Sequence, residues 1–438
     1  MSPPIDPVAS DTALPARTGV VVIGGGIIGV STTLFLTEQG VDVVLCEKGW
    51  IGGEQSSRNW GWCRTMGRDV GEIPLAIESL KLWRGMNERV GRETGFRQCG
   101  IMYLCETEQE LAVQEAWLDE ARNYQVDAQI LRGEALAEIM PGMKAPFVAG
   151  LFTPTDGRAE PVHAAPAIAE AARAHGARIF TECAVRGIDL QAGRIAGVVT
   201  EKGRIACDTV VLAGGAWSRL FAGNAGIDFP ALKVLGSVFR TAPLNGGPEA
   251  SAGGSLFAFR KRLDGGYTIA RRNANTADIT PDHFRLFRDF FPRLKENRRE
   301  IRLRLGQRFW EEFRTPRRWS LDQASPFEAA RVLDPKPNEA VLEEGRRVLC
   351  AAFPAFAGMQ VVQSWGGWMD VTPDAVPVID SVPAIPGFFI AAGFSGHGFG
   401  IGPGAGRLMA DLVTGRTPVV DPAPFRLGRF PRTFRQAA

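Results

Sequence analysis

The sequence predicts a fold of the α/β + α+β class, in which a doubly wound (Rossmann-like) domain carries an inserted domain with a mainly antiparallel sheet. Three stretches indicate this. Residues 19–47 have the pattern strand, glycine turn, helix, strand, whereas residues 232–270 contain several strands with no helix between them. From residue 360 onward the strand–turn–helix pattern returns. Because the first pattern resumes after the second, we expect the second to be an insertion.

The composition is that of an ordinary globular protein. Among 438 residues, 45% are hydrophobic and 22% are charged, and the net charge is only +2. This balance excludes a disordered chain and gives no overall field that would favour nucleic acid. The seven cysteines are scattered without a CxxC pair, so we expect neither a disulfide framework nor a metal site.

The start of the chain lacks the basic stretch and apolar stretch of a signal peptide. Nowhere do 18 apolar residues follow one another, so we expect no transmembrane segment. These features favour a cytoplasmic protein.

The first unit is a complete βαβ motif. It consists of a strand, a glycine turn, a helix ended by Gly40 and a second strand, at residues 19–23, 24–29, 30–39 and 41–46. Gly24 permits the tight turn, Gly26 lets the backbone approach a pyrophosphate, and Gly29 lets helix and strand pack closely. Glu47, after the second strand, can accept both hydroxyls of a ribose and would repel a 2′-phosphate. The motif therefore predicts an adenine dinucleotide, FAD or NAD, at the helix start.

Further elements follow along the chain. We expect helices over residues 74–94, 107–123 and 161–175, and strands near 101–104, 149–153, 177–188, 194–200 and 204–212. The inserted region carries expected strands at 233–241, 255–259 and 267–270 and helices at about 280–290 and 294–313. The expected domains are a dinucleotide-binding domain at 18–100, 149–230 and 360–420, a substrate domain at 101–148 and 231–359, and a C-terminal tail at 421–438.

Three further segments distinguish FAD from NAD. They are Gly52-Gly-Glu-Gln-Ser-Ser-Arg-Asn-Trp-Gly61, Asp208-Thr-Val-Val-Leu-Ala-Gly-Gly-Ala-Trp-Ser218 and Gly393-Phe-Ser-Gly-His-Gly-Phe-Gly-Ile-Gly-Pro-Gly404. With the first turn, they resemble the D-amino acid oxidase/sarcosine oxidase-like (DAO) family of FAD-dependent amine oxidoreductases. The resemblance extends over nearly the whole chain, with the motifs in the family's order. It implies FAD, with the isoalloxazine at the junction of the two domains.

The resemblance also implies which residues contact FAD. Along the ADP half these are Gly24, Gly26, Ile27, Ile28, Gly29, Glu47 and Lys48, with Val185 at the adenine. Along the pyrophosphate, ribityl chain and flavin they are Ser56, Ser57, Arg58, Asn59, Trp60, Gly61, Ala213, Gly214 and Trp217. At the pyrimidine edge of the flavin they are Gly396, His397, Gly398, Phe399 and Gly400. Reduced flavin is negative at that edge, and glycine amides at a helix start supply hydrogen-bond donors there.

His397 has two interpretations. It is either a base near the flavin or a side chain that donates a hydrogen bond to backbone or cofactor and so fixes the glycine loop. We favour the second, because hydride transfer from an amine needs an unprotonated amine more than it needs an enzymic base.

One position departs from the amino-acid-specific members of the family. There, an arginine in a W-x-G-L-R-P-x-T-x-D-G-x-P segment binds the substrate carboxylate. In the matching stretch, 365–377, Met369 takes its place. This argues against simple D-amino acid binding at that position and resembles the γ-glutamylputrescine oxidoreductase-like and D-amino acid dehydrogenase-like branches. Replacement arginines are Arg64, Arg271, Arg272 and Arg158, each of which has an ordinary salt bridge as its alternative role.

Four tryptophans are candidates for an amine pocket through cation–π contact, with core packing as the alternative: Trp60, Trp62, Trp365 and Trp368. The covalent FAD of sarcosine oxidase relatives uses a cysteine close to this segment. The nearest one here, Cys350, is far from it in sequence, so we expect noncovalent FAD. Strand 267–270 has no lysine like the one that oxidase members place near flavin N5, and Lys261 is one strand earlier. This slightly favours a quinone or electron carrier over O₂ as the acceptor.

Arginines and phenylalanines alternate through residues 284–318. They form either a basic amphipathic surface for a membrane or redox partner, or two helices packed through their Phe/Leu face with solvated arginines. We favour the second interpretation, which leaves peripheral membrane contact open. The arginines of the first half are Arg285, Arg288, Arg293, Arg298, Arg299, Arg302 and Arg304. We expect the tail at 425–435 to be extended on the surface.

The sequence therefore predicts an FAD-dependent oxidoreductase that acts on CH–NH or CH–NH₂ donors. It would oxidise the C–N bond of an amine or N-substituted amino acid to an imine by hydride transfer to flavin N5, and the imine would then hydrolyse. The catalytic candidates are Arg64, Arg271, His397 and Trp365. The alternatives are a D-amino acid dehydrogenase or oxidase with a relocated arginine, and a non-catalytic FAD-binding subunit.

Overall fold

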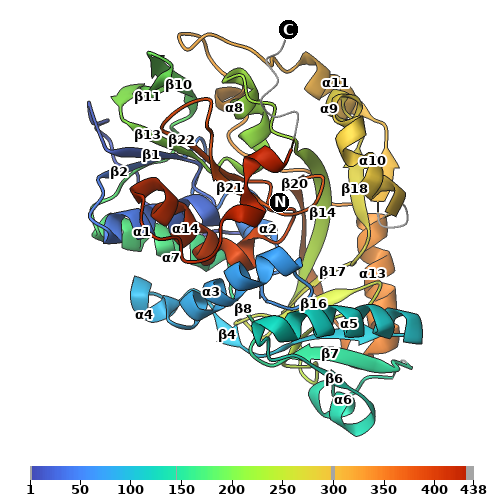
Figure 1. The fold of residues 1–438 in the computed structure, drawn as a ribbon. Coiled ribbons are helices and arrows are strands. Elements are labelled where there is room, and N and C mark those ends of the chain that lie inside the picture. Colours follow the sequence, from blue (N-terminus) through green and yellow to red (C-terminus); the bar gives the residue numbers. More distant parts are fainter. Residues whose placement is uncertain (1, 145, 297–300, 431–438) are drawn as a thin grey trace.

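A computed structural model describes residues 2–144, 146–296 and 301–430. Two main sheets dominate the architecture (Figure 1). One is a six-stranded sheet that contains the N-terminal strands β1 and β2, and the other is a ten-stranded sheet that runs along the opposite side of the molecule. The predicted fold class, a Rossmann-like domain with a second, mainly antiparallel domain, is confirmed.

The six-stranded sheet collects strands from distant parts of the chain. In spatial order it contains β21 (Val378–Ser381), β22 (Phe388–Ala392), β13 (Thr209–Leu212), β1 (Val20–Ile23), β2 (Val43–Cys46) and β9 (Arg178–Phe180). All neighbours are parallel except the pair of β21 and β22. The central strands are runs of valine, isoleucine and leucine that are buried on both faces, as in doubly wound sheets.

Helices and a small sheet cover the two faces of this sheet. On one face lie α1 (Ile27–Glu38), α3 (Ile73–Arg84), α7 (Pro161–Ala174) and α14 (Gly398–Thr414). On the other lie α8 (Ser218–Asn224) and a sheet of β10 (Val185–Gln191), β11 (Arg194–Thr200) and β12 (Gly203–Ala206). Gly40 follows α1 with a φ of +79°, which suits its predicted role of ending the helix.

The ten-stranded sheet is mainly antiparallel. Its strands are β5 (Ile101–Cys105), β6 (Gln129–Leu131), β7 (Ala149–Thr153), β14 (Leu232–Thr241), β15 (Ser251–Gly253), β16 (Ala258–Lys261), β17 (Tyr267–Ala270), β18 (Asn275–Asp278), β19 (Ile301–Arg304) and β20 (Val361–Val371). Only the pairs β15 with β5 and β18 with β19 are parallel among its described strands. The long pair of β14 and β20 brings Met369 next to Val234.

The remaining elements surround these sheets. Around the ten-stranded sheet lie α5 (Glu108–Ala121), α6 (Gly133–Ile139), α9 (Pro281–Arg285), α10 (Phe287–Glu296), α11 (Gln307–Arg314) and α13 (Glu339–Ala352). Helix α12 (Pro326–Ala329) instead packs beside α8, where Phe327 joins the core of the six-stranded sheet. Short elements are α2 (Gln55–Arg58), α4 (Met86–Val90), and the sheet of β3 (Trp62–Cys63), β8 (Gly157–Arg158) and β4 (Arg97–Gln98). The 3₁₀ turns are η1 (Val70–Glu72), η2 (Arg122–Tyr124), η3 (Gly215–Trp217), η4 (Pro354–Phe356), η5 (Ala423–Phe425) and η6 (Leu427–Arg429).

Several predicted elements differ from the structure. The predicted helix 294–313 is wrong, because its middle forms strand β19, where Ile301-Arg-Leu-Arg304 alternates with the period of a strand. Helix α11 starts only after Gly306, which has extended dihedrals. The predicted strand 255–259 lies later, at β16, because residues 254–257 form the turn after β15. The tail, predicted to be extended, forms 3₁₀ turns in its described part, and residues 431–435 lie outside the described residues.

Two expected domain borders also shift. Strand β7 pairs with β5 and β6 in the ten-stranded sheet, so the border expected at residue 149 falls after Thr153. Strand β20 pairs with β14, so the border expected at residue 360 falls after Val371. Both strands precede or follow the cofactor-domain motifs closely in sequence, which explains why their sheet could not be assigned from the pattern alone.

Candidate active site

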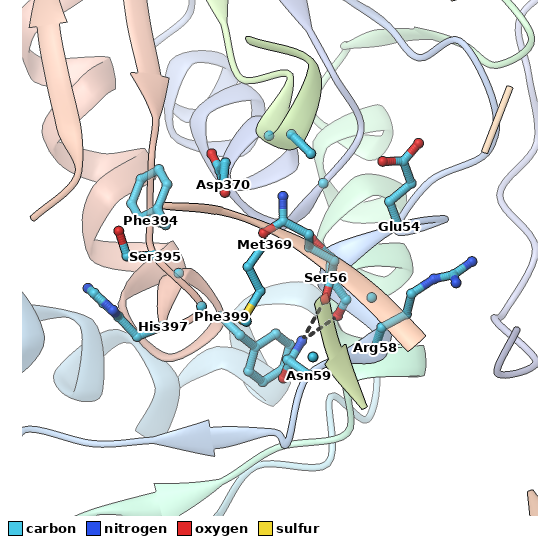
Figure 2. A pocket seen from close by; sticks show the side chains of 18 of the residues that line it. Glu54, Ser56, Arg58, Asn59, Met369, Asp370, Phe394, Ser395, His397 and Phe399 are labelled. Carbon is cyan, nitrogen blue, oxygen red and sulfur yellow. Dashed lines mark hydrogen bonds between the residues drawn. The ribbon is translucent and has the colours of Figure 1, made fainter. Parts of the chain in front are cut away.

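One large cavity lies where the two main sheets meet. Its volume is about 760 Å³, compared with about 20 and 30 Å³ for the next two described cavities. Figure 2 shows side chains from three of its walls: residues 54–59, residues 369–370 at the end of β20, and residues 394–399 before and in α14. The cavity is therefore built from segments that are far apart in sequence.

The glycine turn between β1 and α1 forms one end of the cavity. Gly24 has a φ of +108°, and a Cβ atom built on it would lie 2.4 Å from the carbonyl oxygen of Ala213. A Cβ on Gly29 would lie 1.9 Å from the carbonyl oxygen of Gly24. Gly26 precedes the first residue of α1, so the unpaired N–H groups of the helix start face the cavity. This end suits an anionic group such as a pyrophosphate.

Glu47 lies beside this turn. Its Oε2 accepts a hydrogen bond from the Gly25 N–H at 2.6 Å, and its Oε1 accepts one from the Gly49 N–H at 2.7 Å. Burial raises the pKa of Glu47, while the Lys48 charge and these N–H groups oppose the rise. Lys48 in turn pairs with Glu54 at 2.8 Å. The carboxylate of Glu47 is thus fixed in place at the wall where a ribose is expected.

The serine-rich segment forms a second wall. The Ser56 hydroxyl accepts a hydrogen bond from the Ile27 N–H at 2.8 Å and so joins α2 to the start of α1. Asn59 Nδ2 donates to the Ser56 carbonyl at 2.9 Å (Figure 2), and Asn59 Oδ1 accepts from the Gly61 N–H at 2.7 Å. Arg58 is buried and pairs with Asp334 at 2.7 Å. These bonds fix the bend between α2 and β3.

The glycine loop before α14 forms a third wall. Gly396 has a φ of +83°, and a Cβ built on it would lie 2.6 Å from the sulfur of Met369. A Cβ on Gly400 would lie 2.7 Å from the Trp62 carbonyl oxygen. Met369, which stands where the family resemblance implies an arginine in amino-acid-specific members, lines the cavity. The loop and β20 therefore pack so closely that only glycine fits between them.

Nearly all residues that the family resemblance assigns to FAD line this one cavity. They are Gly24, Gly26, Ile27, Ile28, Glu47, Lys48, Ser56, Arg58, Asn59, Trp60, Gly61, Val185, Ala213, Gly214, Trp217, Gly396, His397, Gly398, Phe399 and Gly400. Gly29 instead packs against the turn, as its expected role requires. Ser57 points elsewhere, and its hydroxyl donates to the Glu54 carbonyl at 3.2 Å. Cys350 lies in α13, outside the cavity.

The opposite end of the cavity is rich in arginine. Four arginines and a tyrosine line it: Arg64, Arg68, Arg271, Arg272 and Tyr103. The guanidinium of Arg272 lies 3.9 Å from the centre of the Tyr103 ring, and that of Arg64 lies 5.4 Å from it. Within the described part of the chain, no carboxylate lies within 4 Å of either guanidinium. Arg271 differs, because it pairs with Glu344 at 3.2 Å.

Arg68 is buried at this end with its Nε atom unpartnered among the described residues. Burial, together with the neighbouring charge of Arg64, lowers the pKa of Arg68 to about 9. Buried donors without partners also occur at Trp62 Nε1 and Arg271 Nε. Because unpaired buried donors are costly, these atoms are available to a ligand with hydrogen-bond acceptors.

Asp156 fixes the loop that carries Arg64 and Arg68. The carboxylate is fully buried and accepts hydrogen bonds from the Thr65 N–H at 2.7 Å, the Thr65 hydroxyl at 2.9 Å and the Met66 N–H at 3.2 Å. Burial raises the pKa of Asp156 to about 6, although these hydrogen bonds oppose the rise. The position of both arginines thus depends on one buried carboxyl group.

His397 binds a side chain that the sequence did not suggest. Its Nε2 lies 2.7 Å from the Oε1 of Glu72, and Glu72 is 2% exposed. The sequence suggested backbone or cofactor as the partner of the ring, whereas within the described residues a carboxylate holds it. Burial lowers the pKa of His397, and the Glu72 charge opposes this.

Three other candidates lie outside the cavity. Trp365 is buried against Trp60 and Val238, and its Nε1 donates to the Arg58 carbonyl at 3.0 Å. Trp368 packs beneath Arg308, whose guanidinium lies 3.9 Å from its ring. Arg158 binds Glu249. The expectation that Trp365 and Trp368 line an amine pocket is therefore wrong, and their role is packing, whereas Trp60 and Trp62 do line the cavity.

Sequence reasoning missed several lining residues. Arg68 and Tyr103 were not singled out, and α5 contributes Val113, Gln114 and Trp117 to the wall. Glu72, which binds His397 from behind the wall, was also missed. Arg68 carried a weak signal, because it lies four residues after Arg64 in the same loop. Tyr103 lies in a buried strand, where nothing in the sequence distinguishes it from a core residue.

Comparisons with known proteins show which proteins this chain is similar to. The family model for FAD dependent oxidoreductases (DAO) matches residues 19–412. The structure of L-amino acid deaminase from Proteus myxofaciens in complex with anthranilate has a TM-score of 0.95 at 36% identity and covers 98% of this chain and 97% of its own. That of L-amino acid deaminase from Proteus vulgaris has a TM-score of 0.93 at 34% identity and covers 97% and 100%. The sarcosine oxidase subunit beta of Arthrobacter sp is 25% identical over 94% of this chain and 90% of its own length.

Proposed function

Because the chain belongs to the DAO family of FAD-dependent oxidoreductases, we propose that its substrate is an α-amino acid whose carboxylate binds at the arginine-rich end of the cavity. The expected reaction class is confirmed: the protein is an FAD-dependent enzyme that oxidises the C–N bond of an amine or amino acid. Because the protein is an enzyme, the alternative of a non-catalytic FAD-binding subunit is set aside.

The cofactor site is proposed in detail as follows. Glu47, Ser56 and the amides at the start of α1 would hold the ADP half, and the 396–400 amides would face the flavin. When bound, FAD takes up the hydride that leaves the substrate carbon. The protein must hold that carbon in place and exclude water from the site.

The observation that carries the carboxylate proposal is the pair of guanidinium groups close to the Tyr103 ring. Arg272 and Arg64 both lie on its ring and lack a carboxylate partner among the described residues. A planar guanidinium presents a fork that fits a carboxylate, and aromatic contact holds it in place beforehand. Arg271, which the sequence offers as a candidate beside Arg64, is less suited because it pairs with Glu344.

The remaining walls suggest the rest of the substrate. Near the arginines, the cavity is lined by the apolar side chains Trp60, Trp62, Val113 and Trp117. We therefore propose a large apolar side chain, and, following the two Proteus deaminases, the L configuration. The imine formed by oxidation would hydrolyse to a 2-oxo acid and ammonia. The D-amino acid alternative remains as the opposite outcome of the test below.

The test is anaerobic reduction of the enzyme-bound flavin, followed by its absorbance. L-phenylalanine should bleach the flavin, whereas D-phenylalanine and phenethylamine, which lacks the carboxylate, should not. Arg272→Gln should weaken L-phenylalanine binding by about 30- to 100-fold, the worth of a charge-assisted hydrogen-bond pair. Arg97→Gln, an exposed arginine paired with Glu93, is the matched control. Equal reduction by phenethylamine would contradict the proposal.

The electron acceptor is a second question. Lys261, the lysine nearest in sequence to the position that oxidases use, binds Glu249 at 2.8 Å and does not line the cavity. We therefore propose an acceptor other than O₂, namely a membrane quinone, and a location at the cytoplasmic face of a membrane. The described helices include none long and apolar enough to cross a bilayer.

An exposed aromatic surface supports this membrane proposal. Five aromatic side chains of α9, α10 and α11 are more than half exposed: Phe284, Phe287, Phe291, Trp310 and Phe313. The expectation that a Phe/Leu face packs these helices together holds only in part: Phe284 of α9 contacts Phe309 of α11, but all five side chains remain largely exposed. Exposed arginines of the same helices, Arg288 and Arg314, suit anionic lipid headgroups. Of the arginines named from sequence, Arg298 and Arg299 lie outside the described residues.

Vesicle sedimentation tests the membrane proposal. The enzyme should sediment with phosphatidylglycerol vesicles, and the double variant Trp310→Ser/Phe313→Ser should remain in solution. Leu190→Ser removes an exposed apolar side chain from β10, which belongs to another sheet, and should change nothing. Binding that survives the double variant would show that these helices are not the membrane contact.

A further inference from the structure

The pair of Glu72 and His397 joins two elements at the rim of the cavity. Glu72 ends η1 and precedes α3, and His397 precedes α14. In Figure 2 the His397 ring points away from Asn59 and Met369. On that side its Nε2 meets Glu72 Oε1 at 2.7 Å. Because Glu72 is buried and ionised, it accepts the proton on Nε2, which fixes the ring in one tautomer.

The other ring nitrogen is left free by this arrangement. No hydrogen bond to His397 Nδ1 is formed by any residue that the structure describes, and this atom is not among the buried unpartnered ones. The side chain is 14% exposed, and His397 lines the cavity. With the proton held on Nε2, Nδ1 carries a lone pair that can accept a proton from a ligand.

The charged groups that face His397 come from one stretch of the chain. They are Glu72, Arg68 and Arg64, all from the chain between β3 and α3. The two arginines offset the negative charge of Glu72, and together with burial they lower the pKa of His397, so that the imidazole is neutral. The same positive charges disfavour an ammonium group nearby, which promotes loss of its proton.

We propose that His397, positioned by Glu72, takes the proton of the substrate ammonium. The inference rests on the proposed function, because an amino acid whose carboxylate binds at the arginine-rich end must place its ammonium one carbon away from that carboxylate. In the step, one N–H bond of the ammonium breaks and its proton forms a bond to Nδ1. The nitrogen keeps the electron pair that the later imine requires, and the two electrons of the α-hydrogen leave with the hydride to FAD.

Glu72 acts through His397 and is a positioning residue. Once Nδ1 is protonated, the imidazolium lies against the Glu72 carboxylate, so the positive charge that arrives has a partner at hydrogen-bond distance. Without the carboxylate, the charged ring would face only Arg64 and Arg68. The carboxylate thus fixes the tautomer before the transfer and stabilises the charge after it.

The first measurement is the rate of anaerobic flavin reduction by saturating L-phenylalanine as a function of pH. At pH 7, His397→Asn should reduce this rate about 100-fold, the lower range for loss of a general base. The rate should recover towards pH 10, where the substrate arrives as free amine. Glu72→Gln should shift the acidic limb of the profile, and the double variant should be no slower than His397→Asn. FAD content, from the ratio of flavin to protein absorbance, shows that each variant is folded and loaded.

The second measurement does not depend on turnover. α-Methyl-L-phenylalanine has the ammonium and carboxylate but no α-hydrogen, so it binds without reducing the flavin, and its binding is followed by the flavin spectrum. In the wild type its Kd should vary less between pH 7 and 9 than in His397→Asn, because the complex can keep the proton on His397 once the ligand carboxylate offsets the charge of Arg64 and Glu72 partners the imidazolium. In His397→Asn the Kd should fall about tenfold per pH unit, because binding must release that proton.

A matched control comes from the pair of His163 and Asp6, whose ring nitrogen and carboxylate lie 2.9 Å apart outside the cavity. His163→Asn should leave both pH profiles unchanged. Profiles of His397→Asn that parallel the wild type would overturn the inference and leave the proposed function intact. A wild-type flavin that no amino acid reduces would overturn both.

Discussion

Arg260 and Glu160 form a two-bonded ion pair that is almost free of solvent. Arg260 Nη1 and Nη2 donate to the two carboxylate oxygens at 2.8 and 2.9 Å, and the side chains are only 1% and 3% exposed. Arg260 lies on β16 of the ten-stranded sheet, whereas Glu160 precedes α7, which packs on the six-stranded sheet. The pair therefore connects the two sheets beside the cavity.

Breaking this pair should destabilise the protein strongly. Glu160→Gln leaves a buried guanidinium unpaired, which costs about 3–5 kcal/mol of unfolding free energy. Denaturant unfolding of the FAD-loaded enzyme would measure this loss of unfolding free energy. The exposed pair of Glu343 and Arg346 supplies the control, because Glu343→Gln should leave the unfolding midpoint unchanged. A midpoint for Glu160→Gln equal to that of the wild type would mean that the pair contributes no stability.

The same carboxylate gives a pH dependence with a defined sign. Burial alone would raise the pKa of Glu160, but the charge and hydrogen bonds of Arg260 outweigh it and lower the pKa from 4.5 to about 2. The folded state therefore binds this proton less readily than the unfolded state. The contribution of the ionised Glu160 carboxylate to the free energy of unfolding is complete above pH 4.5 and is lost as the pH falls towards 2. Acid titration of stability should show this loss in the wild type and not in Glu160→Gln.

Asp156 should give the opposite slope. Burial raises its pKa from 3.8 to about 6, so the folded state holds the proton more readily and the contribution to stability falls as the pH rises from about 4 to 6. In Asp156→Asn this slope should disappear, which comparison of unfolding at pH 4 and pH 6 would reveal. Because the amide cannot accept from both backbone N–H groups, L-phenylalanine binding should also weaken. Unchanged binding would show that the loop with Arg64 and Arg68 holds its position without the carboxylate.

Gly29→Ala should prevent retention of FAD. The added methyl group would lie 1.9 Å from the Gly24 carbonyl oxygen, so the glycine turn must move away from the start of α1. We expect at least a tenfold loss of FAD affinity, measured by the flavin absorbance that remains after gel filtration. Gly223→Ala, at a helix position where a Cβ meets no atom within 4 Å, should retain FAD. Equal retention by both variants would mean that the turn does not position the cofactor.

Trp365→Phe separates packing from catalysis. The change removes the hydrogen bond from the indole to the Arg58 carbonyl and leaves a buried oxygen unpartnered, at a cost of about 1–3 kcal/mol. Stability should fall by this amount, while the rate of flavin reduction and the Kd for L-phenylalanine should stay within twofold of the wild type. A tenfold change in the reduction rate or in the Kd, at full FAD content, would show that Trp365 contributes to the active site.

Local patterns made the cofactor end predictable. The turn from Gly24 to Gly29 and the acid at Glu47 lie within one βαβ unit, where spacing alone determines the geometry. The substrate end was less predictable, because it depends on contacts between distant segments. Glu72 and His397, for example, are 325 positions apart. Trp365 belonged to the right segment, but only the packing of β20 on β14 decides whether it faces the cavity or the core.

The fold was predictable where the pattern had one period and uncertain where strands were short. The buried valine runs of β1 and β2 indicated a parallel sheet, and the structure has one. By contrast, β19 is four residues long and is followed closely by helix α11, so the helical pattern of the neighbours obscured its alternation. Its pairing with β18, which the sequence did not suggest, determines its conformation.

The long pairing of β20 with β14 has a consequence for how the protein can be divided. One strand is hydrogen-bonded into the larger sheet along Leu232–Thr241 and also carries Met369 and Asp370 to the cavity wall. Cutting the chain into separate nucleotide-holding and ligand-holding modules would therefore remove a backbone partner from one piece and a wall from the other. Such pieces could not be exchanged between relatives as independent units, and the enzyme must be inherited and engineered as one folding unit.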